Sequence, residues 1–301
     1  MNPSLIDSQL KCELKANASL AELTTLRVGG AAEWLALPRN LAELGESWRW
    51  AKAEGMPIAL LGAGSNLLIS DRGLPGLVIC TRYLRQTRFE AESGQVTAFT
   101  GEPLATLAWK AAKHGWRGLE WTAGIPGTVG GAVVMNAGAQ GRDTAAVLVN
   151  TSVLELDGSF TTLEPDQLQY GYRSSILQTD CRPVVQATFQ LRPGSDPAAV
   201  KADTAKDLAQ RHSTQPYHLP SCGSVFRNPL PHSAGQLIEQ AGLKGFQIGR
   251  AQVAQRHANF IVNLGGAKAS DVLGLIRHIQ AAIEQRFSVQ LQTEVKIIGE
   301  F

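Results

Sequence analysis

Apolar residues recur along the first half of the chain at helical spacing in some stretches and as short continuous runs in others. Over residues 41–54 they alternate with polar residues at helical spacing, which predicts an amphipathic helix. The run IALLG after Pro57 predicts a buried strand that ends at the glycines of residues 62–70. The β-rich runs LVIC and VTAFTG then precede a helical pattern that starts at Pro103 and ends at Gly115, which are typical helix boundaries.

Short strand-like runs separated by turns occupy the middle of the chain, and helical stretches follow. TSVLELD, GSFTTL and VVQATFQL are separated by Asp-Gly and proline-containing turns, which favours a mixed α+β sheet over repeated βαβ units. Prolines, a glycine and a serine at 192–200 indicate a boundary. Beyond it we expect helices at AAVKADTAKDLAQRH, AGQLIEQAGL and DVLGLIRHIQAAIEQRF, and strands at NFIVNL and VQLQTEVKIIG. The predicted parts are residues 1–82, 83–193 and 194–301.

Composition and charge restrict the classes of protein to which the chain can belong. Of its 301 residues, 44% are hydrophobic and 18% are charged, which is typical of a globular protein with buried cores. A net charge of +2 without any block of like charges argues against nucleic-acid binding. Charged residues interrupt the N-terminal region and no long apolar stretch follows, so we expect no signal peptide, no membrane insertion and a cytoplasmic location. The four cysteines lie far apart without ligand spacing, so neither a metal site nor disulfides are expected.

Two glycine-rich segments are the most informative motifs. Residues 124–138 (GIPGTVGGAVVMNAG) contain five glycines and one proline, which lets consecutive backbone N–H groups approach a ligand. Such groups suit phosphate oxygens. The apolar run that follows is expected to form either a wall or a short helix, and the N-terminus of a helix would favour the anion. Residues 62–70 (GAGSNLLIS) resemble the start of a dinucleotide fingerprint, but the third glycine and the later acidic residue are missing. Two such loops suit one pyrophosphate; the alternative is two unrelated glycine turns.

Seven strings follow one another along the chain in a specific order: TTLRVGGAAEWLALP, LLGAGSNLLISDRGLPGLVI, GLEWTAGIPGTVGGAVVMNAGA, YGYRSSIL, SCGSVFRNP, HANFIVN and TEVKIIGE. Together they resemble the UDP-N-acetylenolpyruvoylglucosamine reductase family, from about Leu23 to Glu300. The resemblance implies an α+β protein, with an FAD-binding fold of the vanillyl-alcohol-oxidase type built from two α+β subdomains. A C-terminal α+β substrate-binding domain follows, and its last strand returns Glu294 to the active site.

The resemblance also implies the ligands of the protein. Both glycine segments would contact the FAD diphosphate, through Gly62, Ala63, Gly64, Ser65, Asn66, Leu67, Gly124, Ile125, Pro126, Gly127, Thr128, Gly130, Gly131, Ala132, Asn136 and Gly138. Residues 62–73 contain neither histidine nor cysteine, so we expect noncovalent FAD. The short region between Arg173 and Ser224 indicates the subtype without a tyrosine-bearing insertion.

The implied reaction is the NADPH-dependent reduction of UDP-N-acetyl-3-O-(1-carboxyvinyl)-glucosamine to UDP-N-acetylmuramate. A hydride at the terminal carbon of the enol ether places negative charge on the α-carbon and its carboxylate, and a proton then quenches it. No side chain donates a hydride, so reduced flavin must, and a nicotinamide must reduce the flavin again. The expected partners are therefore the UDP-sugar and NADPH, and no obligatory protein partner is implied.

The resemblance assigns three catalytic residues. Ser224 in SCGSVFRNP receives the role of proton donor; a serine that only bonds its own turn is the alternative. Arg173 in YGYRSSIL suits a carboxylate or enolate because its guanidinium stays charged and forked, whereas most arginines form surface ion pairs. Glu294 lies in an alternating strand where burial would raise its pKa, so that the neutral acid assists catalysis. Pairing with Lys296 on the same strand face is its structural alternative.

Further residues are weaker candidates. Tyr172, Arg227, Asn228 and Lys244 have side chains suited to the sugar nucleotide or its diphosphate. His257 is either a ligand contact or a structural histidine, and Cys222 introduces the rival idea of a thiol nucleophile. Two rival functions remain open: a flavin oxidase of a small alcohol or hydroxy acid on the same fold, and a nucleotide-binding module without turnover.

Overall fold

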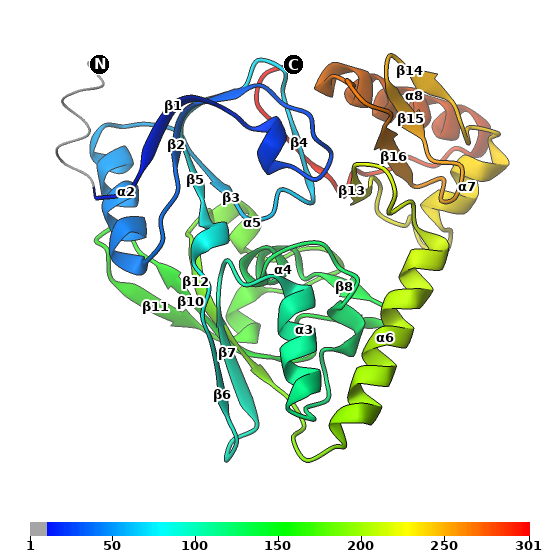
Figure 1. Cartoon of the computed structure of the whole chain (residues 1–301). Coiled ribbons are helices and arrows are strands. Elements are labelled where there is room, and N and C mark those ends of the chain that lie inside the picture. Colours follow the sequence, from blue (N-terminus) through cyan, green and yellow to red (C-terminus); the bar gives the residue numbers. More distant parts are fainter. Residues whose placement is uncertain (1–10) are drawn as a thin grey trace. The chain divides into compact units, whose positions relative to one another are not determined.

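The computed structural model describes residues 11–301, which form two compact units (Figure 1). Of these residues, unit 1 comprises 11–16, Trp34–Ala63 and Gly76–Arg211. Unit 2 comprises Asn17–Glu33, Gly64–Pro75 and His212–Phe301. Two short N-terminal segments therefore fold with the C-terminal part of the chain. The division into three domains at residues 82 and 193 stays a prediction.

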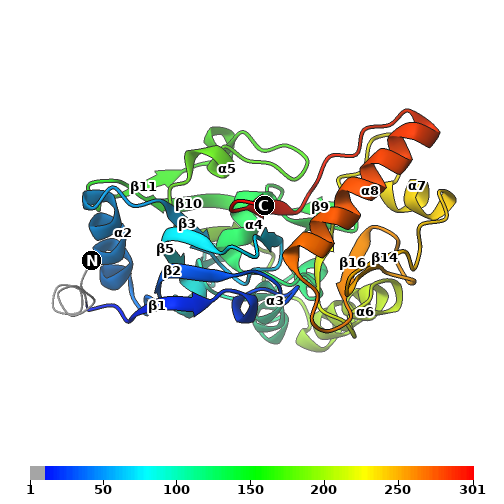
Figure 2. The same cartoon turned by 90° about the horizontal axis from the view of Figure 1, so that it is seen from above.

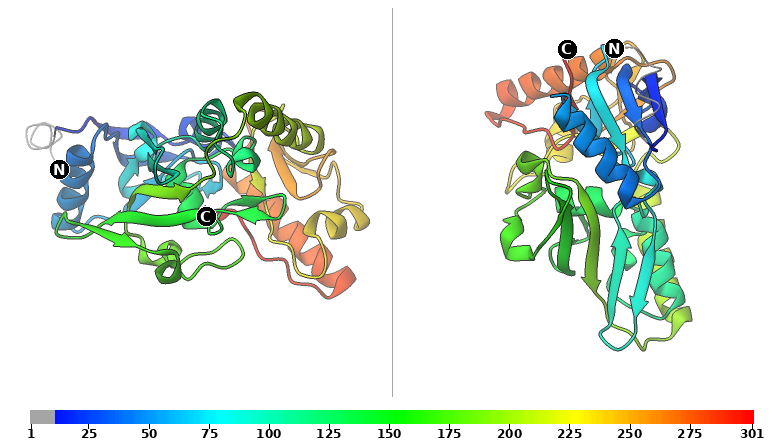
Figure 3. Two further views of the ribbon diagram at one scale, coloured as in Figure 1. Left: turned by 90° about the horizontal axis from the view of Figure 1, so that it is seen from below. Right: turned by 90° about the vertical axis from the view of Figure 1, so that its left-hand side faces the viewer.

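The largest sheet of unit 1 is antiparallel and has the strand order β11-β10-β12-β7-β6. Its strands are β6 Thr87–Glu90, β7 Gln95–Phe99, β10 Leu148–Leu154, β11 Phe160–Leu163 and β12 Val184–Gln190 (Figure 3). Helices α3 (Leu104–Lys113) and α4 (Val129–Met135) pack on it through one hydrophobic core that includes Leu107, Val133 and Phe189. The core therefore fixes the glycine-rich segment that contains α4 to a rigid sheet.

A four-stranded sheet has the order β1-β2-β5-β3 and pairs β3 with β5 in parallel. Its strands are β1 Leu14–Ser19, β2 Ala31–Ala36, β3 Ile58–Leu61 and β5 Leu74–Cys80. Helix α2 (Leu41–Ala53) packs its buried Leu44, Trp48 and Ala51 against residues of β5. The helix begins after Asn40, whose side chain accepts a hydrogen bond from the Glu43 N–H (2.9 Å).

The C-terminal sheet of unit 2 is antiparallel and has the order β13-β16-β15-β14. Its strands are β13 Ser221–Ser224, β14 Gln247–Ile248, β15 Ala251–Val253 and β16 Phe260–Asn263. Helices α7 (Ala234–Gln240) and α8 (Ala269–Phe287) share one hydrophobic core with this sheet (Figure 2). Unit 2 also contains a two-stranded parallel sheet of β4 (Leu67–Ile69) and β17 (Lys296–Ile298).

The remaining elements are short, except for α6 (Pro197–Thr214). They are β8 Gly138–Ala139, β9 Arg142–Asp143, α5 Leu177–Asp180 and the 3₁₀ helices Ala21–Leu23, Thr81–Tyr83, Glu120–Thr122 and Pro165–Leu168. None of the helices between residues 11 and 301 has the length and apolar character that a bilayer crossing requires. The expectation of no signal peptide concerns in part residues 1–10, which lie outside the described residues.

The predicted helices are confirmed as α2, α3, α6, α7 and α8, and the strand at NFIVNL is confirmed as β16. The predicted length of the last strand is wrong. It was expected over VQLQTEVKIIG, but β17 has three residues, and Glu294 lies in a bend before it. The reason is pairing, because β4, the parallel partner of β17, is itself three residues long.

Candidate functional site

The segment 124–138 folds as a turn, the short helix α4 and a left-handed C-cap. Thr128 precedes the helix, and its hydroxyl accepts a hydrogen bond from the Gly131 N–H (3.4 Å). Asn136 ends the helix with φ +43°, and its buried amide donates to the Gly171 carbonyl (3.0 Å). Of the two structures expected for the apolar run, a wall or a short helix, the run forms the helix.

The backbone N–H groups at the start of α4 are largely paired within the protein. Those of Val129 and Gly130 donate to the carbonyls of Glu102 and Thr100, each at 2.9 Å. Among the residues that the structure describes, none accepts a backbone hydrogen bond from the N–H of Gly127 or Thr128. Unit 1 thus offers the two N–H groups just before the helix, rather than those inside it, to an anion.

The start of the first glycine segment lies beside the second one within unit 1. A Cβ on Gly62 would stand 2.7 Å from the Thr128 hydroxyl oxygen, closer than any side chain allows. An alanine at this position would require the Thr128 side chain to move, which would disturb its hydrogen bond with the Gly131 N–H. The start of the first segment and the second segment are therefore neighbours in the folded chain, and their sharing of one pyrophosphate stays a prediction.

Arg173 lies at the other end of the second segment. Its Nη2 donates to the Gly138 carbonyl (2.7 Å), and its guanidinium carbon stands 5.1 Å from the centroid of the half-exposed Tyr172 ring. Arg173 has φ +56°, a left-handed conformation that costs a non-glycine residue about 1 kcal/mol. Backbone hydrogen bonds in both directions between Gly171 and Ser174 impose this conformation (3.1 and 3.2 Å).

In unit 2, the rest of the first glycine segment is held against residues near the N-terminus. Gly64 has φ +65°, and a Cβ there would collide with the Leu23 carbonyl oxygen and stand 2.8 Å from the Thr24 Cα. Within residues 11–301, the N–H groups of Gly64, Ser65 and Asn66 have no backbone acceptor. Three consecutive N–H groups of this kind form a concavity that suits the oxygens of a diphosphate.

Unit 2 brings Ser224 and Glu294 together. Ser224 ends β13, and the Glu294 N–H donates to the carbonyl of the next residue, Val225 (2.8 Å). Both residues are half-buried. The Asn66 side chain donates to the Glu294 carbonyl (3.0 Å), and the Lys296 N–H donates to the Asn66 carbonyl (3.0 Å). The proposed acid, the proposed assisting carboxylate and the first glycine segment are thus neighbours in one unit.

Burial determines the chemistry of the groups around Ser224. It raises the pKa of the Cys222 thiol to about 12, and the negative charge of Glu294 adds to this, so the thiol stays protonated at neutral pH. The rival idea of a thiol nucleophile is therefore not supported. Burial lowers the pKa of His257, and its Nδ1 accepts from the Asn259 N–H (3.2 Å), which is a structural role. Burial, and to a lesser extent the positive charge of Arg227, lower the pKa of Lys296.

The other predicted substrate contacts have partners inside unit 2. The Lys244 ammonium pairs with Glu239 at 2.5 Å, and the Asn228 side chain accepts a hydrogen bond from the Ala234 N–H (3.0 Å) at the start of α7. The Arg227 N–H donates to the Gln292 carbonyl (2.9 Å). These contacts leave their roles in substrate binding as predictions.

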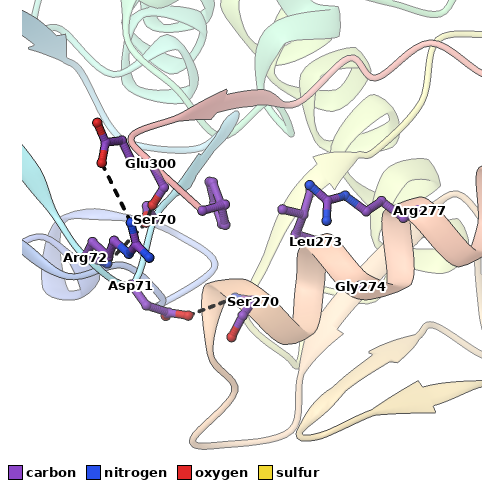
Figure 4. Close-up of a pocket in the computed structure, with 9 residues that line it drawn as sticks. Ser70, Asp71, Arg72, Ser270, Leu273, Gly274, Arg277 and Glu300 are labelled. Atoms are coloured by element: carbon purple, nitrogen blue, oxygen red, sulfur yellow. Dashed lines mark hydrogen bonds and ion pairs between the residues drawn. The ribbon is translucent and has the colours of Figure 1, made fainter.

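A pocket of about 280 Å³ lies elsewhere in unit 2 (Figure 4). Its lining consists of Ser70, Asp71, Arg72, Ser270, Leu273, Gly274, Arg277, Glu300 and Phe301, and none of the predicted site residues is among them. Asp71 accepts hydrogen bonds from the Ala269 and Ser270 N–H groups (2.7 and 2.9 Å), so the start of α8 is already occupied by a carboxylate. The Arg72 Nη1 atom lies 3.7 Å from the Glu300 Oε2 atom, so the two side chains form an ion pair. Because Asp71 already occupies the N-terminus of α8, which is the part of the pocket best suited to bind an anion, this pocket is not the candidate active site.

Among residues 11–301, no cluster of three or more histidine, cysteine or acidic side chains is arranged to hold a metal ion.

One positioning residue near the site is missed by the sequence analysis. Asn259 is 4% exposed, and its side chain makes hydrogen bonds to both the N–H and the carbonyl of Phe226 (2.9 and 2.8 Å). Its backbone carbonyl accepts a third hydrogen bond, from the Val225 N–H (2.8 Å). Asn259 therefore holds the strand that carries Ser224. The available signal was a polar residue at the entrance of the apolar run FIV.

Comparison with known proteins gives two family matches. Residues 215–298 match the C-terminal domain of UDP-N-acetylenolpyruvoylglucosamine reductase, and residues 32–164 match an FAD binding domain. A protein of that reductase name from Acaryochloris marina is 56% identical over 299 residues, covering 99% of this chain and 97% of the relative. One from Trichormus variabilis is 58% identical over 290 residues, covering 96% and 88%.

Solved structures agree with these matches. The crystal structure of UDP-N-acetylenolpyruvylglucosamine reductase from Thermus caldophilus has a TM-score of 0.79 and 34% identity, covering 96% of this chain and 99% of that one. Physcomitrella patens BBE-like 1 has a TM-score of 0.50 at 14% identity, covering 94% and 60%, and so shares the fold alone. The predicted fold, an FAD-binding fold of the vanillyl-alcohol-oxidase type with an additional C-terminal domain, is confirmed.

Proposed function

The chain belongs to the UDP-N-acetylenolpyruvoylglucosamine reductase family, and from this premise we propose how its residues share the work of the reaction. The enzyme reduces UDP-N-acetyl-3-O-(1-carboxyvinyl)-glucosamine to UDP-N-acetylmuramate, with FAD as cofactor and NADPH as reductant. The carbon–carbon double bond of the enol ether receives a hydride equivalent at its terminal carbon and a proton at its α-carbon. NADPH supplies the hydride and leaves as NADP⁺, and the proton is taken up from the solvent, so electrons and protons balance.

The residues of the two glycine segments suit FAD. Gly62 and Gly64 stand where a Cβ would collide, and the N–H groups of Ser65, Asn66, Gly127 and Thr128 have no backbone acceptor among the described residues. These groups would hold the diphosphate. FAD held there would supply the two-electron chemistry that side chains lack, the transfer of a hydride equivalent between NADPH and the enolpyruvyl group. No histidine or cysteine lies in residues 62–73, which supports noncovalent binding.

Ser224, Arg173 and Glu294 would act on the developing charge. The Arg173 guanidinium stays positive and would stabilise the enolate and its carboxylate. The Ser224 hydroxyl would donate its proton to the α-carbon, a strong base at that moment, and Glu294 would assist as its neighbour. The observation that carries the Ser224 assignment is the hydrogen bond from the Glu294 N–H to Val225, which places the two residues on adjacent segments.

The remaining aspects are proposals of the same kind. A cytoplasmic location and independence from an obligatory protein partner fit a nucleotide-sugar substrate and a nicotinamide reductant. Tyr172, Arg227, Asn228 and Lys244 are the proposed substrate contacts.

The two half-reactions separate these roles in an anaerobic stopped-flow experiment. In Ser224→Ala we expect NADPH to bleach the flavin absorbance at the wild-type rate, because that step does not need the serine proton. Reoxidation by the enolpyruvyl sugar nucleotide should slow by about 100-fold or more, the typical contribution of a general acid. Wild-type reoxidation in this variant would refute the assignment. A wild-type protein that stays colourless after reconstitution with FAD would refute the proposed function as a whole.

A further inference from the structure

Helix α6, which belongs to unit 1 as far as Arg211, lies against the rest of that unit (Figure 1). Two parallel rows of its side chains make the contact. Val200, Thr204 and Leu208, four residues apart, form the apolar row; the first two are buried, and Leu208 packs against the unit 1 core. Residues at this spacing share one face of a helix. The apolar row accounts for the docking of the helix, but not for the polar residues beside it.

The polar row, Asp203, Asp207 and Arg211, has the same four-residue spacing. Asp203 pairs with Arg117 (2.7 Å). Asp207 accepts from the Gln140 amide through both carboxylate oxygens (3.1 Å each), with the amide oriented so that its nitrogen faces Asp207. Arg211 donates from its Nε to the Gly124 carbonyl (3.0 Å).

The three partners of the polar row bracket the second glycine segment. Arg117 precedes the segment, Gly124 is its first residue, and Gln140 follows it by two residues. Three successive turns of α6 therefore contact the chain before the second glycine segment, at its first residue and just after its end. Surface ion pairs scattered without function would not be expected to select these three positions.

Of the three contacts, the one between Arg211 and Gly124 lies nearest in sequence to Gly127 and Thr128, whose N–H groups are available to the diphosphate. It fixes the buried carbonyl of Gly124, and the Ile125 N–H donates to Thr122 (2.9 Å), so the backbone up to residue 125 is held. Gly127 and Thr128 follow two and three residues later. The Leu104 N–H donates to the Gly127 carbonyl (3.1 Å) and so holds the Gly127–Thr128 peptide independently. A rotation of the Gly124–Ile125 peptide would therefore redirect the Gly127 N–H.

We propose that Arg211 is a positioning residue for FAD, which orients the Gly127 N–H group through its hydrogen bond to Gly124, with the rest of the α6 polar row as support. The proposal rests on the FAD-binding role of the second glycine segment. It assigns to α6 a part in cofactor affinity beyond that of connecting two parts of the chain.

Two substitutions of matched length test the proposal. In Arg211→Gln, the amide Nε2 is as many bonds from Cα as the arginine Nε, so the donor is kept while the charge is lost. In Arg211→Met, a methyl group takes that place and the donor is lost too. We expect Arg211→Met to weaken FAD binding about tenfold, or about 1.4 kcal/mol. Arg211→Gln should bind FAD nearly as tightly as wild type.

The measurement is a titration of the apoprotein with FAD, followed by flavin fluorescence, with the melting temperature of each apoprotein recorded beside it. Lys206→Met, at an exposed position of the same helix, is the control for loss of a positive charge and should leave the affinity unchanged. Wild-type affinity in Arg211→Met would overturn the proposal. Equal weakening in Arg211→Gln and Arg211→Met would also overturn it, because the charge and not the hydrogen bond would then act. Absence of FAD binding in the wild type would instead refute the proposed function.

Discussion

Gly64→Ala tests whether the first glycine segment needs glycine for its backbone conformation or for its close approach to Leu23 and Thr24. The residue has φ +65°, which costs alanine about 1 kcal/mol. The new methyl group would also collide with the Leu23 carbonyl oxygen and the Thr24 Cα, which are backbone atoms that cannot rotate away. Overpacking of this kind typically costs a further 1–3 kcal/mol, so the total is about 2–4 kcal/mol.

A matched control exists within the same unit. Gly242 has φ +77°, and a Cβ there would meet no atom within 4 Å, so Gly242→Ala carries the conformational cost alone. Urea unfolding of both variants, followed by the circular dichroism of the apoprotein, should show a clearly larger loss of stability for Gly64→Ala. An FAD titration should show weakened binding in Gly64→Ala alone. Equal stability losses and equal FAD affinities in the two variants would refute the steric reasoning.

Two further predictions concern titratable groups of unit 2. Hydrogen bonds from Ser270 and Ala269 outweigh the opposing effect of burial and hold the pKa of Asp71 below its usual range. Asp71→Ala should therefore cost about 1 kcal/mol at pH 7, as loss of a helix cap does, in urea unfolding. Because the folded-state pKa is lowered, this difference should persist above about pH 4 and shrink as the pH falls further, and a pH-independent difference would contradict it. For the thiols, iodoacetamide at pH 8 should label the exposed Cys181 and leave the buried Cys222 unmodified in native protein, as peptide mass spectrometry would detect; labelling of Cys222 at the rate of Cys181 would contradict its raised pKa.

The helices show how far local patterns predict this fold. The helix expected between Pro103 and Gly115 is α3, Leu104–Lys113, because proline, glycine and helical spacing act within a dozen residues. The last strand shows the opposite case. Its apolar alternation predicts a long strand, but a strand extends only where a partner does, and β4 offers three residues to β17. Glu294 thereby falls in a bend rather than on a strand face.

The candidate site likewise has features that the sequence predicts and features that it does not. Glycine content and order of motifs were enough to single out residues 62–70 and 124–138, since the need for positive φ and close approach restricts the residue type itself. They did not reveal that the N–H groups of Val129 and Gly130 are already paired with Glu102 and Thr100. Nor did they indicate Asn259 or Arg211, which resemble ordinary polar residues until their partners are known.

By itself the sequence determined the helices, the two glycine segments, the family and the residue types suited to the reaction. The tertiary structure alone decided which of these groups are neighbours. The Asn66 side chain and the Glu294 carbonyl are 228 residues apart in sequence and 3.0 Å apart in unit 2. The physical reason is that conformational preferences and caps act over a few residues, whereas the packing of a shared core brings distant segments together.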